Sequence, residues 1–309
     1  MKWNRHFGFA VFTVVLVSAS CEKSVEPIPL DFHNRILFTS QRSGKYQIYM
    51  MNPDGSGITK LTPDNYSNSE GVWSPNANKI IFNSEEQTYE ETAMWIMNSD
   101  GSDRRLLTYG YSMSWSPDGQ TVAFTHIPNL PLYRDYYLYT IRPDGSGWSQ
   151  LTTTPGFVES VSCWSPNGMA VYLSSNRHDS THLNFEIYSI TLDSLKVTRI
   201  TYTQNGFSHS PYFSPDGQLI AYVSSEGGIN QPAIFIMNAD GSNKHLVAKP
   251  PTGQVYHRPR WSPDGQRLVF TSGLTDGSTK VFVSMVNIDG SNLHTVISDS
   301  YAYPTDWSK

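Results

Sequence analysis

WSPDGQTVAFTH, residues 115–126, contains the unit that decides the fold, a five-residue turn followed by an apolar strand. Proline fixes φ at the first central position of such a turn, Asp or Asn fits the second, and Gly takes the left-handed conformation. The turn recurs at residues 73–77, 164–168, 213–217 and 261–265, and a sixth copy is cut short at residues 307–309. Successive copies lie 42 to 49 residues apart, which indicates a repeat protein.

Each of the five intervals, and the stretch before the first copy, also contains a second turn, with an apolar strand before it and a shorter strand after it. This turn is Asp-Gly in five copies and Asp-Ser in one, at residues 54–55, 100–101, 144–145, 193–194, 240–241 and 289–290. Asp-Gly between such strands is a strong hairpin signal. With the strand that precedes the first turn, each unit has four strands, as a propeller blade does. We therefore predict an all-β fold, a six-bladed β-propeller over residues 31–309.

The two ends of the repeat complement each other. The first unit starts directly at Arg35, without a strand that ends in the Trp-Ser-Pro turn, whereas the last unit is only that strand, residues 302–308. We expect the C-terminal strand to complete the first blade, because an unpaired sheet edge is a liability. The aromatic residue of each turn is expected to pack between neighbouring blades, where a large flat side chain removes the most apolar area from water.

The repeat resembles a known one. SQRSGKYQIYMMNPDGSG, residues 40–57, together with the Trp-Ser-Pro-Asp-Gly turns, is similar to the Pro-Asp propeller repeat of the TolB family over residues 31–309. The resemblance implies a TolB-like propeller. TolB itself carries an α/β domain and a short binding segment before its propeller, whereas only about ten residues separate Cys21 from the first expected strand, so a Tol-Pal role does not follow. The repeat also occurs in prolyl-peptidase-like enzymes and oligogalacturonate lyases, so fold alone does not give function.

The first 20 residues predict a signal peptide. Lys2 and Arg5 precede an apolar run of eleven residues, 7–17, which is too short for a membrane span but has the size of a signal h-region. Cys21 follows small residues, and the segment resembles a bacterial lipoprotein signal, which implies a lipid on Cys21. Residues 21–30, with two prolines, are expected to be a tether. We therefore expect a Gram-negative cell-envelope lipoprotein, periplasmic or on the outer-membrane surface.

Composition restricts the partners. Without the first 20 residues, 20 basic and 27 acidic residues remain, a net charge of −7. This charge argues against nucleic acid and against a basic patch on anionic lipid headgroups. We expect a monomer that reaches the membrane through its lipid alone and binds a protein or peptide.

Motifs of catalysis are absent from the sequence. There is no Gly-x-Ser-x-Gly elbow, no His-Glu-x-x-His, no phosphate-binding Gly loop and no paired Cys-x-x-Cys. No residue is therefore assigned a catalytic role, no cofactor is expected, and the chain is predicted not to be an enzyme.

One position of the repeat attracts polar side chains. Four residues before the turn aromatic, at the expected start of the innermost strand, the six copies carry Ser69, Tyr111, Ser160, His209, His257 and Tyr303. These side chains should ring one end of the central channel. Arg258 and Arg260 flank the ring and could meet an acidic ligand or be exposed strand residues. His209 and His257 are weak metal candidates, because a metal site would need a third ligand that the sequence does not place.

Two functions remain open at this point. The first is a non-catalytic propeller lipoprotein that serves as a protein-binding or peptide-binding platform at the cell envelope. The alternative is a carbohydrate-active propeller that binds or cleaves an acidic glycan at the channel end, in the manner of an oligogalacturonate lyase. Convergence of His209 and His257 with a third metal ligand would favour the second.

Overall fold

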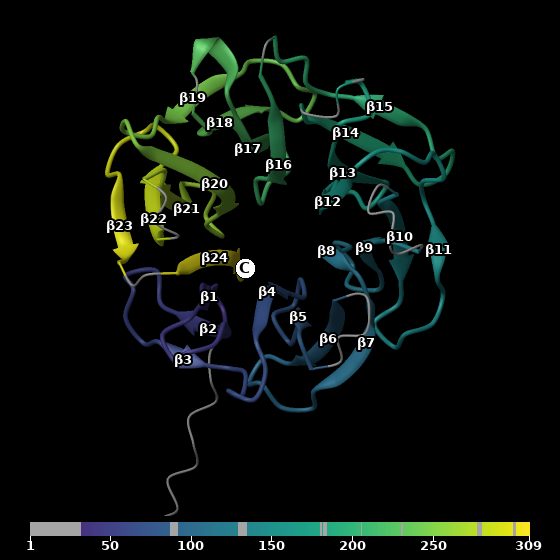
Figure 1. Ribbon diagram of the computed structural model, residues 1–309, viewed down its shortest axis with the longest axis vertical. Helices are drawn as coiled ribbons and strands as arrows, with labels where there is room; N and C mark the ends of the chain where they lie inside the picture. The colour runs from purple at the N-terminus through teal and green to yellow at the C-terminus, as the bar shows by residue number, and fades with distance from the viewer. Residues whose placement is uncertain are drawn as a thin grey trace, which may run out of the picture. The chain divides into compact units, whose positions relative to one another are not determined.

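A computed structural model describes residues 32–86, 92–128, 135–179, 181, 184–204, 206–229, 231–276, 280–298 and 301–309. The signal peptide, Cys21 and the tether expected from the sequence lie outside these residues. Residues 32–309 form one compact unit, and it contains the predicted all-β propeller: six antiparallel four-stranded sheets arranged in a ring around a central channel (Figure 1). Within the described residues no helix is long and apolar enough to cross a membrane.

The blades are numbered from the N-terminus, with strands in order from the channel outward. Blade 1 is β24 (Ala302–Trp307), β1 (Ile36–Ser40), β2 (Gln47–Met51) and β3 (Thr59–Lys60). Blade 2 is β4 (Asn68–Trp73), β5 (Lys79–Ser84), β6 (Ala93–Asn98) and β7 (Arg105–Tyr109). Blade 3 is β8 (Tyr111–Trp115), β9 (Val122–His126), β10 (Tyr137–Ile141) and β11 (Ser149–Gln150).

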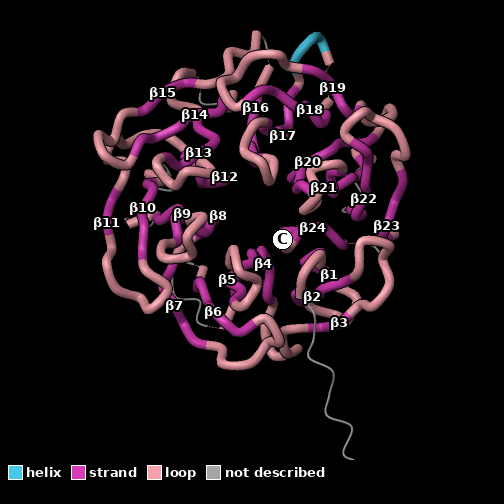
Figure 2. The backbone as a smooth tube through the Cα atoms, turned by 180° about the vertical axis from the view of Figure 1, so that it is seen from behind, coloured by secondary structure: helices cyan, strands magenta, loops and turns pink. Residues whose placement is uncertain are grey.

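Blades 4 to 6 repeat this order, and Figure 2 shows the same ring from behind. Blade 4 is β12 (Glu159–Trp164), β13 (Ala170–Ser175), β14 (Glu186–Thr191) and β15 (Val197–Arg199). Blade 5 is β16 (Ser208–Phe213), β17 (Leu219–Ser224), β18 (Ala233–Asn238) and β19 (His245–Ala248), with the short 3-10 helix η1 (Glu226–Gly228) between β17 and β18. Blade 6 is β20 (Gln254–Trp261), β21 (Arg267–Leu274), β22 (Val281–Asn287) and β23 (His294–Ile297).

The C-terminal strand closes the ring, as predicted. β24 pairs antiparallel with β1, with Trp307 opposite Ile36 and Ala302 opposite Ser40. The innermost strand of blade 1 therefore comes from the end of the chain and its three outer strands from the beginning. This pairing leaves neither end with an open inner edge.

The Trp-Ser-Pro-Asp-Gly turns have the expected hydrogen bonds. In the 115–119 copy the Gly119 amide donates to the Ser116 carbonyl at 2.9 Å, and the Ser116 hydroxyl accepts from the Thr121 amide at 2.9 Å. Asp118 accepts from the Gln120 amide at 3.0 Å. Gly119 has φ +68°, and Ala77 takes the same left-handed conformation with φ +54°. Each turn thus uses its polar residues to bond its own backbone.

The turn aromatics pack between blades, which confirms the predicted role. Trp73 packs with Leu37 and Ile48 of blade 1, and Trp307 packs with Val269 and Val283 of blade 6. Three of the indoles also donate a hydrogen bond to a main-chain carbonyl on the innermost strand of the preceding blade: Trp115 to Val72, Trp164 to Ser114 and Trp261 to Tyr212. Each tryptophan therefore fixes its blade against the previous one.

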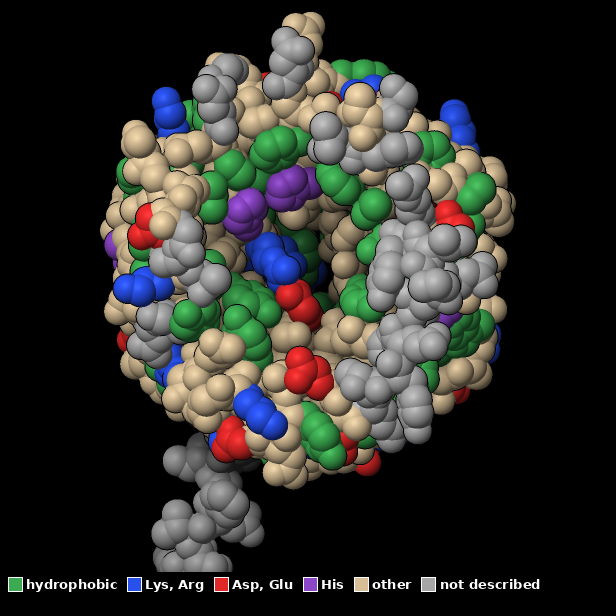
Figure 3. Space-filling model, viewed as in Figure 1, with side chains coloured by type: hydrophobic (Ala, Val, Ile, Leu, Met, Phe, Trp, Pro, Cys, Tyr) green, Lys and Arg blue, Asp and Glu red, His purple; other side chains and the backbone are tan. Residues whose placement is uncertain are grey.

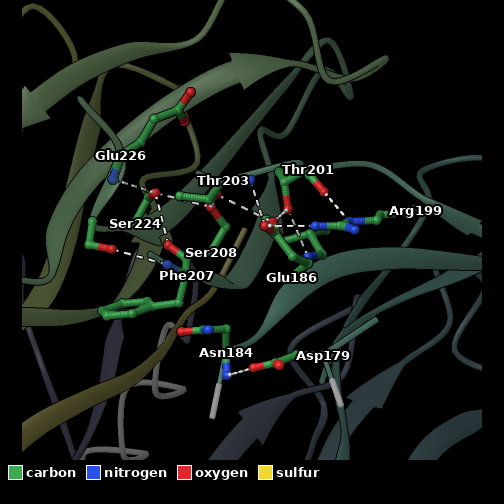
Figure 4. Close-up of polar contacts among 12 residues, drawn as sticks. Asp179, Asn184, Glu186, Arg199, Thr201, Thr203, Phe207, Ser208, Ser224 and Glu226 are labelled. Atoms are coloured by element: carbon green, nitrogen blue, oxygen red, sulfur yellow. Dashed lines mark hydrogen bonds and ion pairs between the residues drawn. The ribbon is translucent and has the colours of Figure 1, made fainter. Parts of the chain in front are cut away.

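A threonine near the end of several repeats accepts a hydrogen bond from a main-chain amide of the third strand of its blade. The hydroxyls of Thr62, Thr152 and Thr201 accept hydrogen bonds from the amides of Ile48, Leu138 and Ile187, at 2.9 to 3.0 Å. In blade 4 the buried carboxylate of Glu186 joins this arrangement, and Figure 4 shows its contacts with Arg199, Thr201 and Thr203. In blades 1, 3 and 4 this threonine therefore terminates the blade.

Candidate functional site

The six ring residues occupy equivalent places on the innermost strands. Each pairs with a residue near the end of the second strand of its blade: Ser69 with Asn83, Tyr111 with Thr125, Ser160 with Ser174, His209 with Val223, His257 with Thr271 and Tyr303 with Thr39. A β-bulge shifts the register directly after this position in blades 2, 3, 5 and 6 and one residue later in blades 1 and 4. The bulge puts an additional residue next to the channel in each of these blades.

Three of the six ring residues converge on one cavity. His209, His257 and Tyr303 line a cavity of about 550 Å³ together with Tyr46, Ser210, Arg258, Thr271 and Val281. We call this cavity the mouth. Figure 3 looks onto this end of the channel, where histidine, basic and acidic side chains meet around a hollow. Blades 5, 6 and 1 supply the converging side chains.

The other three ring residues do not line the mouth. The Ser160 hydroxyl donates to the Ser112 hydroxyl at 2.9 Å, and both residues line an inner cavity of about 130 Å³ further along the channel. Ser69 and Tyr111 line neither cavity. The ring is therefore one-sided: three of its four hydrogen-bonding aromatic side chains lie on blades 5, 6 and 1, and the fourth, Tyr111, is on blade 3.

The aromatic side chains of the mouth are stacked. The His209 and His257 rings lie 5.9 Å apart with an interplanar angle of 18°, and Phe207 stacks on the other face of His209 at 5.4 Å. The Arg258 guanidinium lies over the Tyr303 ring at 5.0 Å. These contacts hold flat π faces and N–H donors around the mouth, which suits a ligand with both apolar and acceptor groups.

Electrostatics keeps the two histidines neutral. Burial lowers the pKa of His209 to about 3, with further lowering by His257 and Arg258. Burial and Arg258 also lower the pKa of His257. A histidine with a lowered pKa carries no charge at neutral pH, so each ring has one N–H donor and one acceptor nitrogen. Nδ1 of His209 is hydrogen-bonded with the Ser210 hydroxyl at 2.9 Å. The positive charge of the mouth therefore belongs to Arg258.

The geometry does not support a metal at the histidine pair. A ring nitrogen binds a metal in the plane of its ring, and two nearly parallel stacked rings do not direct their nitrogens to one point. Among the described residues no group of three or more His, Cys, Asp and Glu side chains could hold a metal ion. Within the part of the chain that the structure describes, His209 and His257 therefore have no third His, Cys, Asp or Glu beside them to complete a metal site.

The sequence placed Arg260 beside the ring but missed its channel partners Tyr212 and Asp306. Arg260 lies over the Tyr212 ring at 4.4 Å, and its Nε donates to the Thr305 carbonyl at 2.8 Å. The Tyr212 hydroxyl donates to Asp306 at 3.1 Å, and the amides of Trp73 and Trp307 also donate to this carboxylate at 2.9 Å. Burial nevertheless raises the pKa of Asp306. Tyr212, Arg260 and Asp306 each stand one residue before a turn aromatic. A comparison of the repeats at that position would also have found Tyr212 and Asp306.

The channel has a different opening at its other end. A cavity of about 230 Å³ is lined there by the Trp-Ser-Pro turns, with the prolines Pro75, Pro117, Pro166, Pro215 and Pro263 and the C-terminal Lys309. We call it the turn-side opening. Since the innermost strands run from the mouth to the turns, the two openings lie at opposite ends of the channel. The charged residues that line the turn-side opening are Asp306 and Lys309.

Comparison with known proteins agrees with the architecture. Residues 18–163 and 156–305 match the family described as TolB beta propeller domain. The protein Atu1656 of Agrobacterium fabrum is 28% identical over 232 residues, 72% of this chain and 74% of that protein. The Tol-Pal system protein TolB of Alcanivorax borkumensis is 32% identical over 124 residues, 40% of this chain and 25% of that protein. The crystal structure of TolB from Acinetobacter baumannii has a TM-score of 0.74 at 21% identity, over 91% of this chain and 68% of that chain.

Proposed function

The chain belongs to the TolB beta propeller domain family, and on this basis we propose that it is a non-catalytic binding platform for a protein or peptide at the cell envelope. The observation that carries the proposal is the mouth, where His209, His257, Tyr303 and Arg258 converge on one cavity. Concave sites with aromatic walls and a few polar groups are the usual places for ligands. The closed ring supports such a site, because side chains fixed on strands lose little entropy when a ligand binds.

A polypeptide partner is favoured over other classes of ligand. One relative is named as a Tol-Pal system protein, and its name places it in an assembly of proteins. Because this chain spans only 25% of that relative, the proposal takes from it the class of partner and no particular partner. Without the first 20 residues the net charge of the chain is −7, which also disfavours nucleic acid as a partner.

The proposal includes attachment to a membrane through Cys21. The basic residues, the apolar run and the cysteine of the N-terminal segment support this attachment. It places the propeller in the periplasm or on the outer-membrane surface of a Gram-negative cell. Mass spectrometry of the N-terminal peptide of the native protein tests it: a diacylglyceryl group on Cys21 is expected, and an unmodified Cys21 or an intact residue 1 would contradict it.

An acidic glycan is the alternative ligand of the mouth. Arg258 and the flat face of Tyr303 could hold an acidic sugar. Cleavage in the manner of an oligogalacturonate lyase would require a metal, and the stacked histidines do not meet a third ligand among the described residues. Metal analysis of the purified native protein separates the two hypotheses, because a stoichiometric metal would favour the carbohydrate-active alternative.

The double substitution His209→Ala with His257→Ala is expected to abolish partner capture. The two rings form one wall of the mouth, and both changes together remove its stacking surface and two hydrogen-bonding groups. Both rings are only half-buried and border the cavity, so the melting temperature should stay close to that of the wild type. Capture from envelope extracts, with identification of the captured polypeptide by mass spectrometry, is the measurement.

A matched variant controls for the loss of two histidines. His245→Ala with His294→Ala removes two exposed histidines from the outer strands β19 and β23, and it should capture the partner normally. If the folded mouth variant captures the partner as well as this control does, the binding site lies elsewhere, for example in the loop 130–136, most of which lies outside the described residues. A large fall in its melting temperature would make the histidines structural and contradict the assignment.

A further inference from the structure

An ion pair crosses the channel between blades that are not neighbours. Glu70 is on β4 of blade 2 and Arg258 is on β20 of blade 6, and blade 1 stands between these two blades in the ring. Nη1 of Arg258 contacts both carboxylate oxygens of Glu70. The other ion pairs between described residues join residues close in sequence. This pair is therefore a feature of the channel and does not belong to any single blade.

The β-bulge of the repeat accounts for the backbone conformation of these two residues, but it does not require their charges. Both occupy the left-handed region at the bulge, with φ of 58° for Glu70 and 56° for Arg258. Ser112 and Ser210 have the same conformation at the equivalent positions of blades 3 and 5. A small neutral side chain thus fits the bulge, and a charged one is not needed to form it.

The pair lies at the boundary between the two cavities of the channel. Arg258 lines both the mouth and the inner cavity, whereas Glu70 lines the inner cavity. The Arg258 and Glu70 side chains keep 41% and 33% of their surface open, and this open surface faces the channel. An ion pair as open as this contributes little to stability. Arg258 is therefore accessible from the mouth while Glu70 holds it from the other side.

Arg258 has donors left for a second acceptor. A guanidinium carries five N–H donors in a fork that matches a carboxylate. Among the described residues, the hydrogen bonds of Arg258 side-chain atoms use Nη1 alone. On the side of the mouth, His209, His257 and Tyr303 line the same cavity, and their side chains carry N–H and O–H donors. An anion that enters the mouth would meet these donors together with the guanidinium.

We propose that Arg258 is the receptor for a carboxylate that enters through the mouth, and that Glu70 occupies this receptor when no ligand is bound. The inference rests on the proposed function and names the chemistry of the partner: an Asp or Glu side chain, or a C-terminal carboxylate, of the bound polypeptide. With Glu70 in place, the receptor carries no net charge, and an incoming carboxylate must compete with it. Glu70 thereby selects for ligands that add contacts beyond a single carboxylate.

The test uses acetate as the probe and Glu70→Gln as the variant. Loss of the competing charge should lower the Kd for acetate at least tenfold. The acetate titration is followed through the imidazole NMR signals of His209 and His257. The double variant Glu70→Gln with Arg258→Gln is neutral, keeps similar side-chain volumes and leaves no charge unpaired, so it should fold normally and bind acetate no better than the wild type. Equal acetate affinity for Glu70→Gln and the wild type would overturn the proposal, and so would unchanged tight binding by the double variant.

A second set of probes separates this inference from the proposed function. Capped peptides that contain one Glu, and their Gln counterparts, are titrated into the same three proteins. Tighter binding of the Glu peptide than of acetate, with the same order of variants, supports a polypeptide ligand. If acetate binding follows the predicted order but no Glu peptide binds more tightly than acetate, the carboxylate receptor stands and the proposed polypeptide function fails.

Discussion

Deletion of residues 302–309 is expected to unfold the propeller. The deletion removes β24, which leaves β1 without its inner partner and opens blade 1 to the channel. It also removes Trp307, which packs between Ile36 of blade 1 and Val269 of blade 6. Trp307→Ala alone should lower the free energy of unfolding by about 3–5 kcal/mol, because the indole is 5% exposed and the cavity that it leaves lies in the core. Denaturant unfolding, monitored by circular dichroism, measures both effects.

Trp148→Ala is the matched control for the loss of a tryptophan. Trp148 is 45% exposed and lies on the outer rim of blade 3, so its removal should cost much less than the removal of Trp307. A truncated protein as stable as the full chain would contradict a ring closed by its C-terminus. Equal losses for the two tryptophan variants would contradict the inter-blade role of Trp307.

Glu186→Ala is expected to destabilise blade 4 by about 3–5 kcal/mol, the usual cost of breaking a buried, hydrogen-bonded ion pair. The Glu186 side chain is fully buried and contacts Arg199 at 3.1 Å. It also accepts hydrogen bonds from the Thr201 hydroxyl and the Thr203 amide (Figure 4). Alanine leaves the buried Thr201 hydroxyl and the partly buried Thr203 amide and Arg199 without this acceptor. The free energy of unfolding from urea titration measures the loss.

The repeat itself provides the control for this carboxylate. Blade 1 has a neutral amide at the equivalent position, where Gln47 accepts from the Thr62 hydroxyl at 2.6 Å and the Asn68 amide group at 3.0 Å. Glu186→Gln should therefore cost clearly less than Glu186→Ala, since it keeps an acceptor for Thr201. If alanine is tolerated as well as glutamine, the contacts of Glu186 do not stabilise the blade.

The fold could be predicted because its determinants are local and repeated. Each Trp-Ser-Pro-Asp-Gly turn bonds its own backbone, as Ser116 and Asp118 show, so the same residues form the same turn wherever they recur. Ring closure followed from the two incomplete units, since only residues 302–308 could supply the strand that the first unit lacks. The packing of Trp307 between blades then followed from its place in the repeat.

The site could be predicted only in part, because its contacts join distant segments. The position four residues before the turn aromatic identified His209 and His257, which the register indeed places side by side on adjacent blades. No pattern links Glu70 to Arg258, which are 188 positions apart. Their contact depends on two bulges and on side-chain reach across the channel, and a repeat alignment shows neither. The one-sided convergence on Tyr303 was missed for the same reason.

Site-directed photo-cross-linking in cells tests the central claim, that a polypeptide binds at the mouth, most directly. Benzoylphenylalanine replaces Tyr46, which lines the mouth, or Lys309, which lines the turn-side opening. The account predicts a discrete cross-linked polypeptide from position 46, its loss when His209 and His257 are both alanine, and no such product from position 309. A cross-linked polypeptide from position 309 but not from position 46 would contradict it.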